Sequence, residues 1–298
     1  MKVLVIAGPT GVGKTALAVE IAKKLNGEII SGDSVQVYKY LDIGSAKVTD
    51  KEMDGVKHHL IDYLEPDENY SVARFQKEVR QKITEITSLG KLPIICGGTG
   101  LYIKAALTKY EFEHNKRDLD YLTKFDETSN EDLHEILSKI DPTSANAFHK
   151  NNRRRILRAI EYFEVNGEMI SSKKDSNESL YDSFIIGLRL DRQLLYDRIN
   201  IRVDSMLESG LLDEVRSLTK YKESINAIGY NEMFNYLDGL STFDDAVELM
   251  KQNSRRYAKR QFTWFSNQME TNWIDVENCT LEELSVKALN TLEKNKFI

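Results

Sequence analysis

The octapeptide GPTGVGKT, residues 8–15, constrains the fold of this chain more than any other stretch. It matches the pattern G-x-x-x-x-G-K-[ST], in which backbone N–H groups surround phosphate oxygens and the lysine adds a positive charge. A strand-length apolar run precedes it, and apolar residues at helical spacing follow it. A phosphate loop between a strand and a helix predicts a parallel α/β protein. The residues that we expect to surround the phosphates are Gly8, Pro9, Thr10, Gly11, Val12, Gly13, Lys14 and Thr15.

The rest of the chain divides into two regions of different pattern. Strand and helix patterns alternate as far as residue 110, which predicts a parallel sheet flanked by helices. Residues 111–181 are polar, charged and mostly helical, so we interpret them as an inserted helical domain. The strand pattern returns at residues 184–190. We therefore expect a catalytic core made of residues 1–110 and 182–298.

Composition argues against several classes of protein. Hydrophobic residues make up 41% of the chain and charged residues 30%, which is typical of a globular protein. No stretch suggests a membrane helix, so we expect no membrane association and a cytoplasmic location. The two cysteines, Cys96 and Cys279, lack a C-x-x-C spacing and predict reduced thiols, not a disulfide or a zinc site. A net charge of −6 allows a basic surface only locally.

A phosphate loop alone does not identify the reaction, and the usual companion motifs of nucleotide hydrolases are missing. A GTPase also needs D-x-x-G, which this sequence lacks. Residues 115–118 match its N-K-x-D motif, but the stretch before them is too charged to be the buried strand that this motif follows. The strand expected at residues 92–96 ends in GGTG and not in the acidic residue of a hydrolase. These absences favour a transferase.

Asp33 directly follows the second expected strand. Ligands of open α/β sheets bind outside the carboxyl ends of the strands, so we expect Asp33 to lie beside the phosphate loop. A carboxylate there can bind Mg²⁺, or it can accept a proton or a hydrogen bond from an acceptor substrate. It can also stabilise its own loop in an Asx turn. The residues alone leave these roles open, whereas the loop pattern itself assigns Mg²⁺ to the hydroxyl of Thr15.

Two basic clusters are candidate contacts for nucleic acid. The first lies at residues 153–158, and the second lies at residues 251–260 with aromatic residues interleaved. Lysine and arginine bind phosphates, and aromatic rings stack on unpaired bases. The same pattern also describes a solvated helix face with its aromatic residues in the core, so the pattern alone does not decide.

The order and spacing of several motifs resemble those of the tRNA dimethylallyltransferases, also called tRNA isopentenyltransferases. After GPTGVGKT come SGDSVQVYKYLDIGSAK, HHLID and GGTGLYIKA. The match continues through NNRRRILRAIE, RVDSMLESGLLDEVRSL, AIGYNE and AKRQFTWF, so it covers nearly the whole chain. Ser45 and Val48 stand where threonine and proline are common in that family, and neither departure affects a chemical role.

The resemblance implies a reaction. Enzymes of this family transfer the dimethylallyl group of dimethylallyl diphosphate to N6 of the adenosine 3′ of the anticodon, position 37 of certain tRNAs, and release diphosphate. The resemblance also implies a core similar to the P-loop kinase fold, an inserted domain that helps to bind the anticodon stem-loop, a requirement for Mg²⁺, and a monomer. The phosphate loop would hold the leaving group, and the target adenosine would be flipped out of the anticodon loop.

The resemblance also assigns roles to single residues. Asp33 would be the general base for N6, and the diphosphate would contact Thr10, Lys14 and Arg216. The residues that it assigns to tRNA binding are Asp33, Ser34, Val35, Gln36, Thr99, Arg154, Arg155, Ile156, Leu157, Arg158, Lys259 and Arg260.

Two other classes of function remain open from the sequence. A small-molecule or nucleotide kinase also fits a phosphate loop followed by an acidic residue after the second strand, and such an enzyme would consume ATP. A noncatalytic RNA-binding protein would bind tRNA without releasing diphosphate. Use of ATP and release of diphosphate therefore distinguish the three.

Overall fold

The chain folds into two compact units. The computed structural model describes residues 1–110, 123–172 and 178–298. The larger unit contains Met1–Lys109 and Glu178–Ile298, and the smaller one contains Tyr110–Asn177. The N-K-x-D match at residues 115–118 lies outside the described residues.

Backbone hydrogen bonds join the segment where the chain leaves the larger unit to the segment where it returns. The N–H of Lys109 donates to the carbonyl oxygen of Glu178 at 2.9 Å, and Thr108 pairs with Ser179 in an antiparallel bridge. Residues 178–181, which we expected in the insert, therefore group with the larger unit, because these contacts fix them to it.

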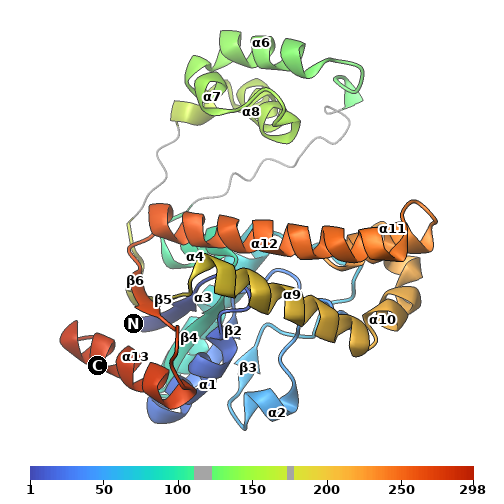
Figure 1. Ribbon diagram of the computed structural model, residues 1–298. Helices are drawn as coiled ribbons and strands as arrows, with labels where there is room; N and C mark the ends of the chain where they lie inside the picture. The colour runs from blue at the N-terminus through green and yellow to red at the C-terminus, as the bar shows by residue number, and fades with distance from the viewer. Residues whose placement is uncertain (111–122, 173–177) are drawn as a thin grey trace. The chain divides into compact units, whose positions relative to one another are not determined.

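A parallel sheet forms the centre of the larger unit, and it has six strands in the described part of the chain (Figure 1). These strands are β1 (Lys2–Ala7), β2 (Gly27–Ser31), β3 (His58–His59), β4 (Leu92–Gly97), β5 (Asp182–Arg189) and β6 (Asn272–Asp275). Their order across the sheet is β3-β2-β4-β1-β5-β6, so β1 is flanked by β4 and β5. Because the carboxyl ends of parallel strands share one edge, the loops after β1, β2 and β4 lie together. The expected parallel α/β class is confirmed.

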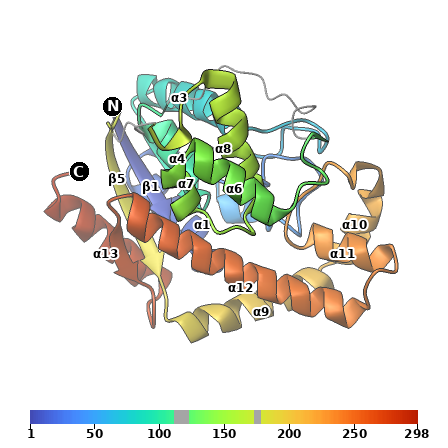
Figure 2. The same cartoon turned by 90° about the horizontal axis from the view of Figure 1, so that it is seen from above.

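Helices cover both faces of the sheet. The helices of the larger unit are α1 (Lys14–Lys24), α2 (Asp50–Met53), α3 (Val72–Ser88), α4 (Gly100–Leu107), α9 (Arg192–Glu208), α10 (Leu211–Ser217), α11 (Tyr230–Leu237), α12 (Phe243–Gln268) and α13 (Leu281–Lys294). Figure 2 shows α3 and α13 on opposite sides of the strands.

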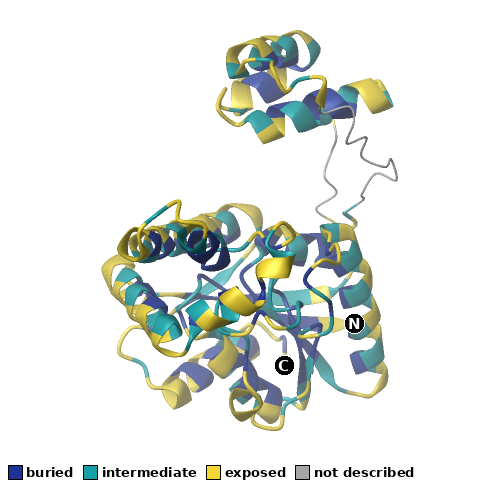
Figure 3. Ribbon diagram, turned by 90° about the vertical axis from the view of Figure 1, so that its right-hand side faces the viewer, coloured by how far each residue is buried: buried dark blue, intermediate teal, exposed yellow. Residues whose placement is uncertain are grey.

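The two faces follow from the alternation of side chains along each strand. Leu4 and Ile6 of β1 pack with α1, α9 and α13, whereas Val3 and Val5 pack with α3 and α4 on the other face. Figure 3 shows that buried positions are concentrated in the strands, while each helix is buried along one side. None of the helices in the described part of the chain is both long and apolar enough to cross a membrane.

A separate hydrophobic cluster joins the loop after β2 to the C-terminal helices. Leu41 of that loop packs with Val203 of α9, Val215 of α10, Met233 of α11 and Met250 of α12. This packing holds the loop that begins at Asp33 against helices that are more than 150 residues away in the sequence.

The smaller unit is helical in its described residues, as the composition predicts. Its helices are α6 (Asn130–Ile140), α7 (Pro142–Ala147) and α8 (Arg153–Asn166), followed by a 3-10 turn at Ile170–Ser172. Leu133 and Leu137 of α6 pack against Ile156 and Ile160 of α8 in a small core of its own.

Candidate functional site

The loop between β1 and α1 has the backbone of an anion-binding cradle. Gly8, Gly11 and Gly13 have positive φ angles of 139°, 80° and 95°, which other residues rarely adopt. A Cβ on Gly8 would lie 2.6 Å from the carbonyl oxygen of Leu188, so this glycine also permits the close approach to β5. Gly13 caps α1 without a side-chain acceptor, so the first N–H groups of the helix remain available to a phosphate.

Lys14 begins α1 and folds back over the loop. Its Nζ donates to the carbonyl oxygen of Pro9 at 2.7 Å. The pKa of Lys14 is lowered to about 8, mainly by burial and also by Arg202, while Cys96 and Asp33 act in the opposite direction. A lysine with a lowered pKa lacks a full countercharge, which a bound phosphate would supply.

Arg202 is a second cation beside the cradle. It lies on α9, one turn after Ile199, whose Cγ1 would be 3.4 Å from a Cβ on Gly11, so the helix packs directly on the phosphate loop. Burial lowers the pKa of Arg202, and Asp33 and Glu52 partly offset this effect. Among the described residues, no carboxylate forms an ion pair with its guanidinium. Arg202 is therefore charged, half-buried and available to an anion.

Arg216, to which the motif resemblance assigns the diphosphate contact, lies in a different environment. It is exposed on α10, and its guanidinium donates to Asp213, three residues earlier, at 2.8 Å. The arginine that perturbs Lys14 is Arg202. Sequence reasoning missed Arg202 although the quoted stretch RVDSML begins with it, because nothing local distinguishes it from other arginines of a helix.

Asp33 follows β2 directly, as expected. Its Oδ1 accepts hydrogen bonds from the backbone N–H groups of Val35 and Gln36 at 2.7 Å and 3.2 Å. This is the Asx turn that the sequence left open. Asp33 partly offsets the lowering of the pKa values of Lys14 and Arg202 by burial, so its carboxylate lies close to both cations. No hydrogen bond engages Oδ2 in the described part of the chain, which leaves one oxygen for a ligand.

Helix α12 contributes two further residues that the sequence did not assign to the site. The side chain of Gln261 is buried, and its Oε1 accepts a hydrogen bond from the N–H of Thr10 at 2.9 Å. Tyr257 lies one turn earlier, where burial and Asp33 together raise its pKa to about 12. Their signal in the sequence was the basic and aromatic stretch, whose aromatic residues we could not place.

Thr99 joins this group from the turn after β4. It is the N-cap residue of α4, yet its side chain makes no capping hydrogen bond. Its Oγ1 is buried and has no hydrogen-bond partner in the part of the chain that the structure describes, and Thr99 lowers the pKa of Tyr257, so the two hydroxyls lie near each other. The predicted contact residue therefore has a hydroxyl to offer, and it is not a plain helix cap.

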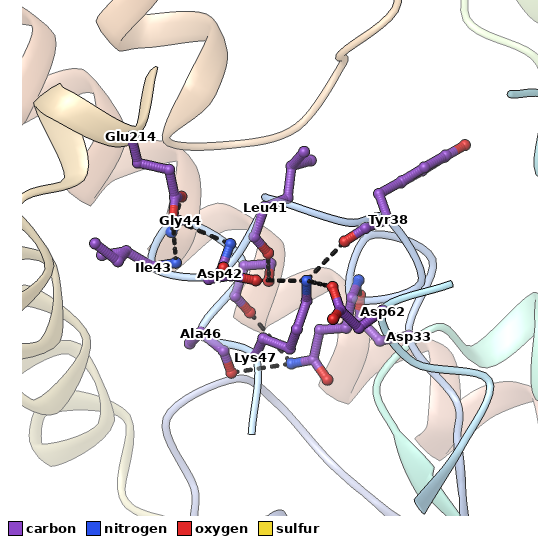
Figure 4. A network of polar contacts seen from close by, with 12 residues as sticks. Asp33, Tyr38, Leu41, Asp42, Ile43, Gly44, Ala46, Lys47, Asp62 and Glu214 are labelled. Atoms are coloured by element: carbon purple, nitrogen blue, oxygen red, sulfur yellow. Dashed lines mark hydrogen bonds and ion pairs between the residues drawn. The ribbon is translucent and has the colours of Figure 1, made fainter. Parts of the chain in front are cut away.

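The loop that carries Ser34, Val35 and Gln36 is folded back on itself (Figure 4). These residues are half-buried. The side-chain amide of Gln36 donates to the carbonyl oxygens of Ser45 and Ala46 at 3.2 Å and 3.1 Å. The amide nitrogen of Gln36 is thus used inside the loop, which leaves its carbonyl oxygen and the backbone to meet a substrate.

The residues of the predicted basic cluster in the insert lie on different sides of α8, some exposed and some buried or paired. Arg154 and Arg155 are exposed at the start of the helix, and Arg158 pairs with the buried carboxylate of Glu161 at 3.0 Å. Ile156 is fully buried in the core of the insert, so its side chain cannot reach RNA. The exposed arginines are the ones that remain available to phosphates.

Leu157 and Arg153 have structural roles within the insert. Leu157 packs against its hydrophobic core. The guanidinium of Arg153 donates to the carbonyl oxygen of Thr128 at 2.6 Å and also to that of Phe125. These contacts explain why only part of the arginine run is exposed.

Lys259 and Arg260 are exposed on α12, and the guanidinium of Arg260 lies 5.7 Å from the ring centroid of Tyr257. Two other aromatic residues of this stretch have neighbours elsewhere in the larger unit. Phe262 is exposed, with its ring centroid 4.7 Å from that of Trp273, and the half-buried ring of Trp264 lies so close to Gly100 that a Cβ there would clash with it. Tyr257 is the aromatic residue of the stretch whose pKa responds to Asp33 and Thr99, so it lies at the site.

Comparisons with known proteins assign the chain to a family. A family model described as IPP transferase matches residues 36–268. A tRNA dimethylallyltransferase of Bacillus cereus (strain B4264) is 51% identical over 285 residues, which cover 92% of this chain and 90% of that protein.

Solved structures extend the likeness to the fold. A tRNA delta(2)-isopentenylpyrophosphate transferase from Staphylococcus epidermidis is 44% identical, covers 99% of both chains and superposes with a TM-score of 0.75. A eukaryotic dimethylallyltransferase, studied while acting on tRNA, is 30% identical with a TM-score of 0.83, over 99% of this chain and 79% of that one. With these matches across both the sequence and the fold, the chain belongs to the IPP transferase family.

Proposed function

We propose that this protein transfers the dimethylallyl group of dimethylallyl diphosphate to N6 of adenosine 37, the nucleotide 3′ of the anticodon in certain tRNAs. Beyond family membership, the observation that carries the proposal is the carboxylate of Asp33 beside a phosphate cradle with two cations, Lys14 and Arg202. This combination can stabilise a diphosphate leaving group on one side and accept a proton on the other.

The leaving group is the first requirement of the reaction. When the bond between C1 of the dimethylallyl group and the diphosphate oxygen breaks, negative charge accumulates on the diphosphate. The backbone N–H groups of the phosphate loop, Lys14 and Arg202 would stabilise that charge as it develops. Gln261 holds the N–H of Thr10 and so supports the shape of the loop.

The nucleophile is the second requirement. N6 of adenine uses its electron pair to form the new bond to C1, and it must then lose a proton. Oδ2 of Asp33 is the candidate acceptor, because the Asx turn fixes the carboxylate through Oδ1. A positioned general base typically contributes about 10²–10⁴-fold to the rate.

Mg²⁺ fits this site as a companion of the diphosphate. The described residues contain no group of three or more His, Cys, Asp or Glu side chains that could hold a metal. Mg²⁺ bound by substrate phosphates needs only one or two protein ligands, and the hydroxyl of Thr15, at the start of α1, would be such a ligand. When bound, the ion would neutralise charge on the diphosphate oxygens.

A direct assay tests the proposal. The protein is incubated with unmodified tRNA, dimethylallyl diphosphate and Mg²⁺, and the nucleosides and ribonuclease fragments of the tRNA are then analysed by mass spectrometry. We expect dimethylallyladenosine at position 37 with no effect of ATP. We also propose that the monomer is the active form, because the cradle, Asp33 and Arg202 belong to the same unit. Consumption of ATP without a modified nucleoside would favour the kinase alternative.

The exposed arginines of the insert predict that binding to tRNA depends on salt concentration. Reversing the charges of Arg154 and Arg155 should weaken tRNA binding and flatten its dependence on salt, by about 0.7–0.9 in log–log slope per lost phosphate contact. Affinity for dimethylallyl diphosphate should not change. Reversal of Lys139 and Lys150, which pair with glutamates on the same insert, is a control of equal charge. Equal losses in both variants would contradict a specific contact.

A matched pair of variants identifies the arginine that binds the diphosphate. Arg202→Gln and Arg216→Gln remove the same charge from α9 and α10. If Arg202 stabilises the leaving group, its loss should slow single-turnover transfer by roughly 10²–10³-fold, the usual range for one lost stabilising donor. Transfer rates and diphosphate affinities of both variants are compared. A larger loss of transfer rate in Arg216→Gln would instead assign the diphosphate contact to Arg216, as the motif resemblance implies.

A further inference from the structure

Glu214 of α10 fastens the loop after β2 by three successive backbone hydrogen bonds (Figure 4). Its Oε2 accepts from the N–H groups of Asp42 and Ile43 at 3.1 Å and 2.7 Å. Its Oε1 accepts from the N–H of Gly44 at 3.0 Å. An ionised carboxylate has only acceptors to offer and so matches a turn that presents consecutive N–H groups.

Tyr230 completes this arrangement from the start of α11. Its hydroxyl donates to Oε1 of Glu214 at 2.6 Å, and its side chain is fully buried. Burial and the neighbouring carboxylate raise the pKa of Tyr230, so it remains a protonated donor. A Cβ on Gly44 would lie 2.6 Å from this ring, which shows that the turn packs directly against it.

The fastened turn is connected to Asp33 by hydrogen bonds within the loop. The side chain of Gln36 donates to the carbonyl oxygens of Ser45 and Ala46, next to the turn. The N–H of Gln36 donates in turn to Oδ1 of Asp33. Gln36 therefore joins the turn that Glu214 holds to the carboxylate proposed as the base.

Lys47 closes the far end of the same loop. Its side chain is only 8% exposed, and its Nζ donates to the carbonyl oxygen of Tyr38 at 2.7 Å and to Asp62 at 2.6 Å. Lys47 thus fixes this end of the loop, while Glu214 adds hydrogen bonds from α10 to the apolar packing of Leu41 and Gly44 against the helices behind the turn.

We propose that Glu214 is a positioning residue for prenyl transfer, which acts by holding the 42–44 turn and through it the carboxylate of Asp33. Both of its oxygens are engaged by four donors, so it has no free acceptor for a metal or for a substrate proton. The inference rests on the proposed function, because its effect is on the chemical step of that reaction.

Glu214→Gln is the test. The substituted amide keeps the shape, but its NH₂ group must face either the Asp42 and Ile43 N–H groups or that of Gly44. We expect hydrogen exchange at residues 42–44 to accelerate, and single-turnover transfer to fall by roughly 10- to 100-fold, the scale of a small misplacement of a reacting group. The dissociation constant for dimethylallyl diphosphate should be unchanged, because the cradle does not include this loop.

Two other variants separate positioning from general stability. Tyr230→Phe removes one donor and leaves the three backbone bonds, so it should give a smaller effect in the same direction. Glu28→Gln alters a buried carboxylate that pairs with His59 and Lys91 at the amino end of β2, away from the site. Its stability should fall without a change in the single-turnover rate.

The outcomes are distinguishable. An unchanged rate or unchanged exchange at residues 42–44 in folded Glu214→Gln overturns the inference, as does an equal rate loss in Glu28→Gln. If Glu214→Gln does not fold, Tyr230→Phe must show the partial effect for the inference to stand. Failure of the wild-type protein to modify tRNA would instead refute the proposed function, and the exchange measurement would still decide whether Glu214 holds the turn.

Discussion

Replacing Lys14 with alanine is expected to abolish detectable prenyl transfer in a protein that stays folded. The change removes the lysine of the cradle and leaves Arg202 as a cation beside it for the diphosphate. Loss of one preorganised stabilising group typically costs roughly 10²–10³-fold, and Lys14 contributes full charge as well as a donor. Single-turnover rates and diphosphate titrations measure the effect, and near-normal transfer by a folded variant would contradict the assignment of the cradle.

The lowered pKa of Lys14 predicts that both stability and diphosphate affinity depend on pH. The pKa of Lys14 is lowered from 10.5 to about 8 in the folded protein. Between these two pH values the unfolded chain binds more protons than the folded chain. The unfavourable contribution of the lysine to stability therefore disappears as pH rises. Diphosphate affinity should move in the opposite direction and decrease above pH 8, because the free protein loses the ammonium charge. The Lys14→Ala protein should lack this decrease, and parallel pH profiles for both proteins would exclude Lys14 as its source.

The second large effect is expected for Asp33→Asn. Asparagine keeps an oxygen that can accept from the N–H groups of Val35 and Gln36, so the Asx turn and the fold should persist. It cannot take up a proton at N6. Single-turnover transfer should therefore fall by roughly 10²–10⁴-fold, while affinities for tRNA and dimethylallyl diphosphate remain close to those of the wild type.

The same variant separates a base from a metal ligand. If Asp33 mainly held Mg²⁺, diphosphate affinity and the Mg²⁺ requirement would shift, and added Mg²⁺ would restore part of the rate. If the carboxylate served only the turn, stability would decrease slightly and the chemical step would be unaffected. Binding titrations, a Mg²⁺ titration and single-turnover rates on this one protein distinguish the three cases.

The parts of the site that the sequence predicted are those that local patterns determine. The phosphate loop and Asp33 each directly follow a strand, and parallel strands bring such positions together at one edge of the sheet. Arg202 and Gln261 reach the same place only because α9 and α12 pack against the phosphate loop, and a helical pattern does not say which turn of a helix meets a distant loop. These two residues therefore required the structure.

Among the residues that the motif resemblance assigned to the site, some lie in an environment that suits the assigned role and others do not, for a physical reason. A motif gives the identity of a residue but not its exposure. Arg216 and Arg202 lie in one quoted stretch, yet one is exposed and paired with Asp213, and the other is half-buried without an ion pair among the described residues. In the same way, Ile156 lies within the arginine run but its side chain fills the core of the insert.

The backbone pairing of Lys109 with Glu178 has a consequence for how such proteins vary. Because the chain leaves the core and returns to it at one point, the core needs only that the ends of the insertion meet. The entropic cost of closing a flexible loop grows with the logarithm of its length, by about 0.6 kcal/mol for each doubling. Natural selection can therefore lengthen, shorten or exchange the inserted module, while the core evolves under separate constraints.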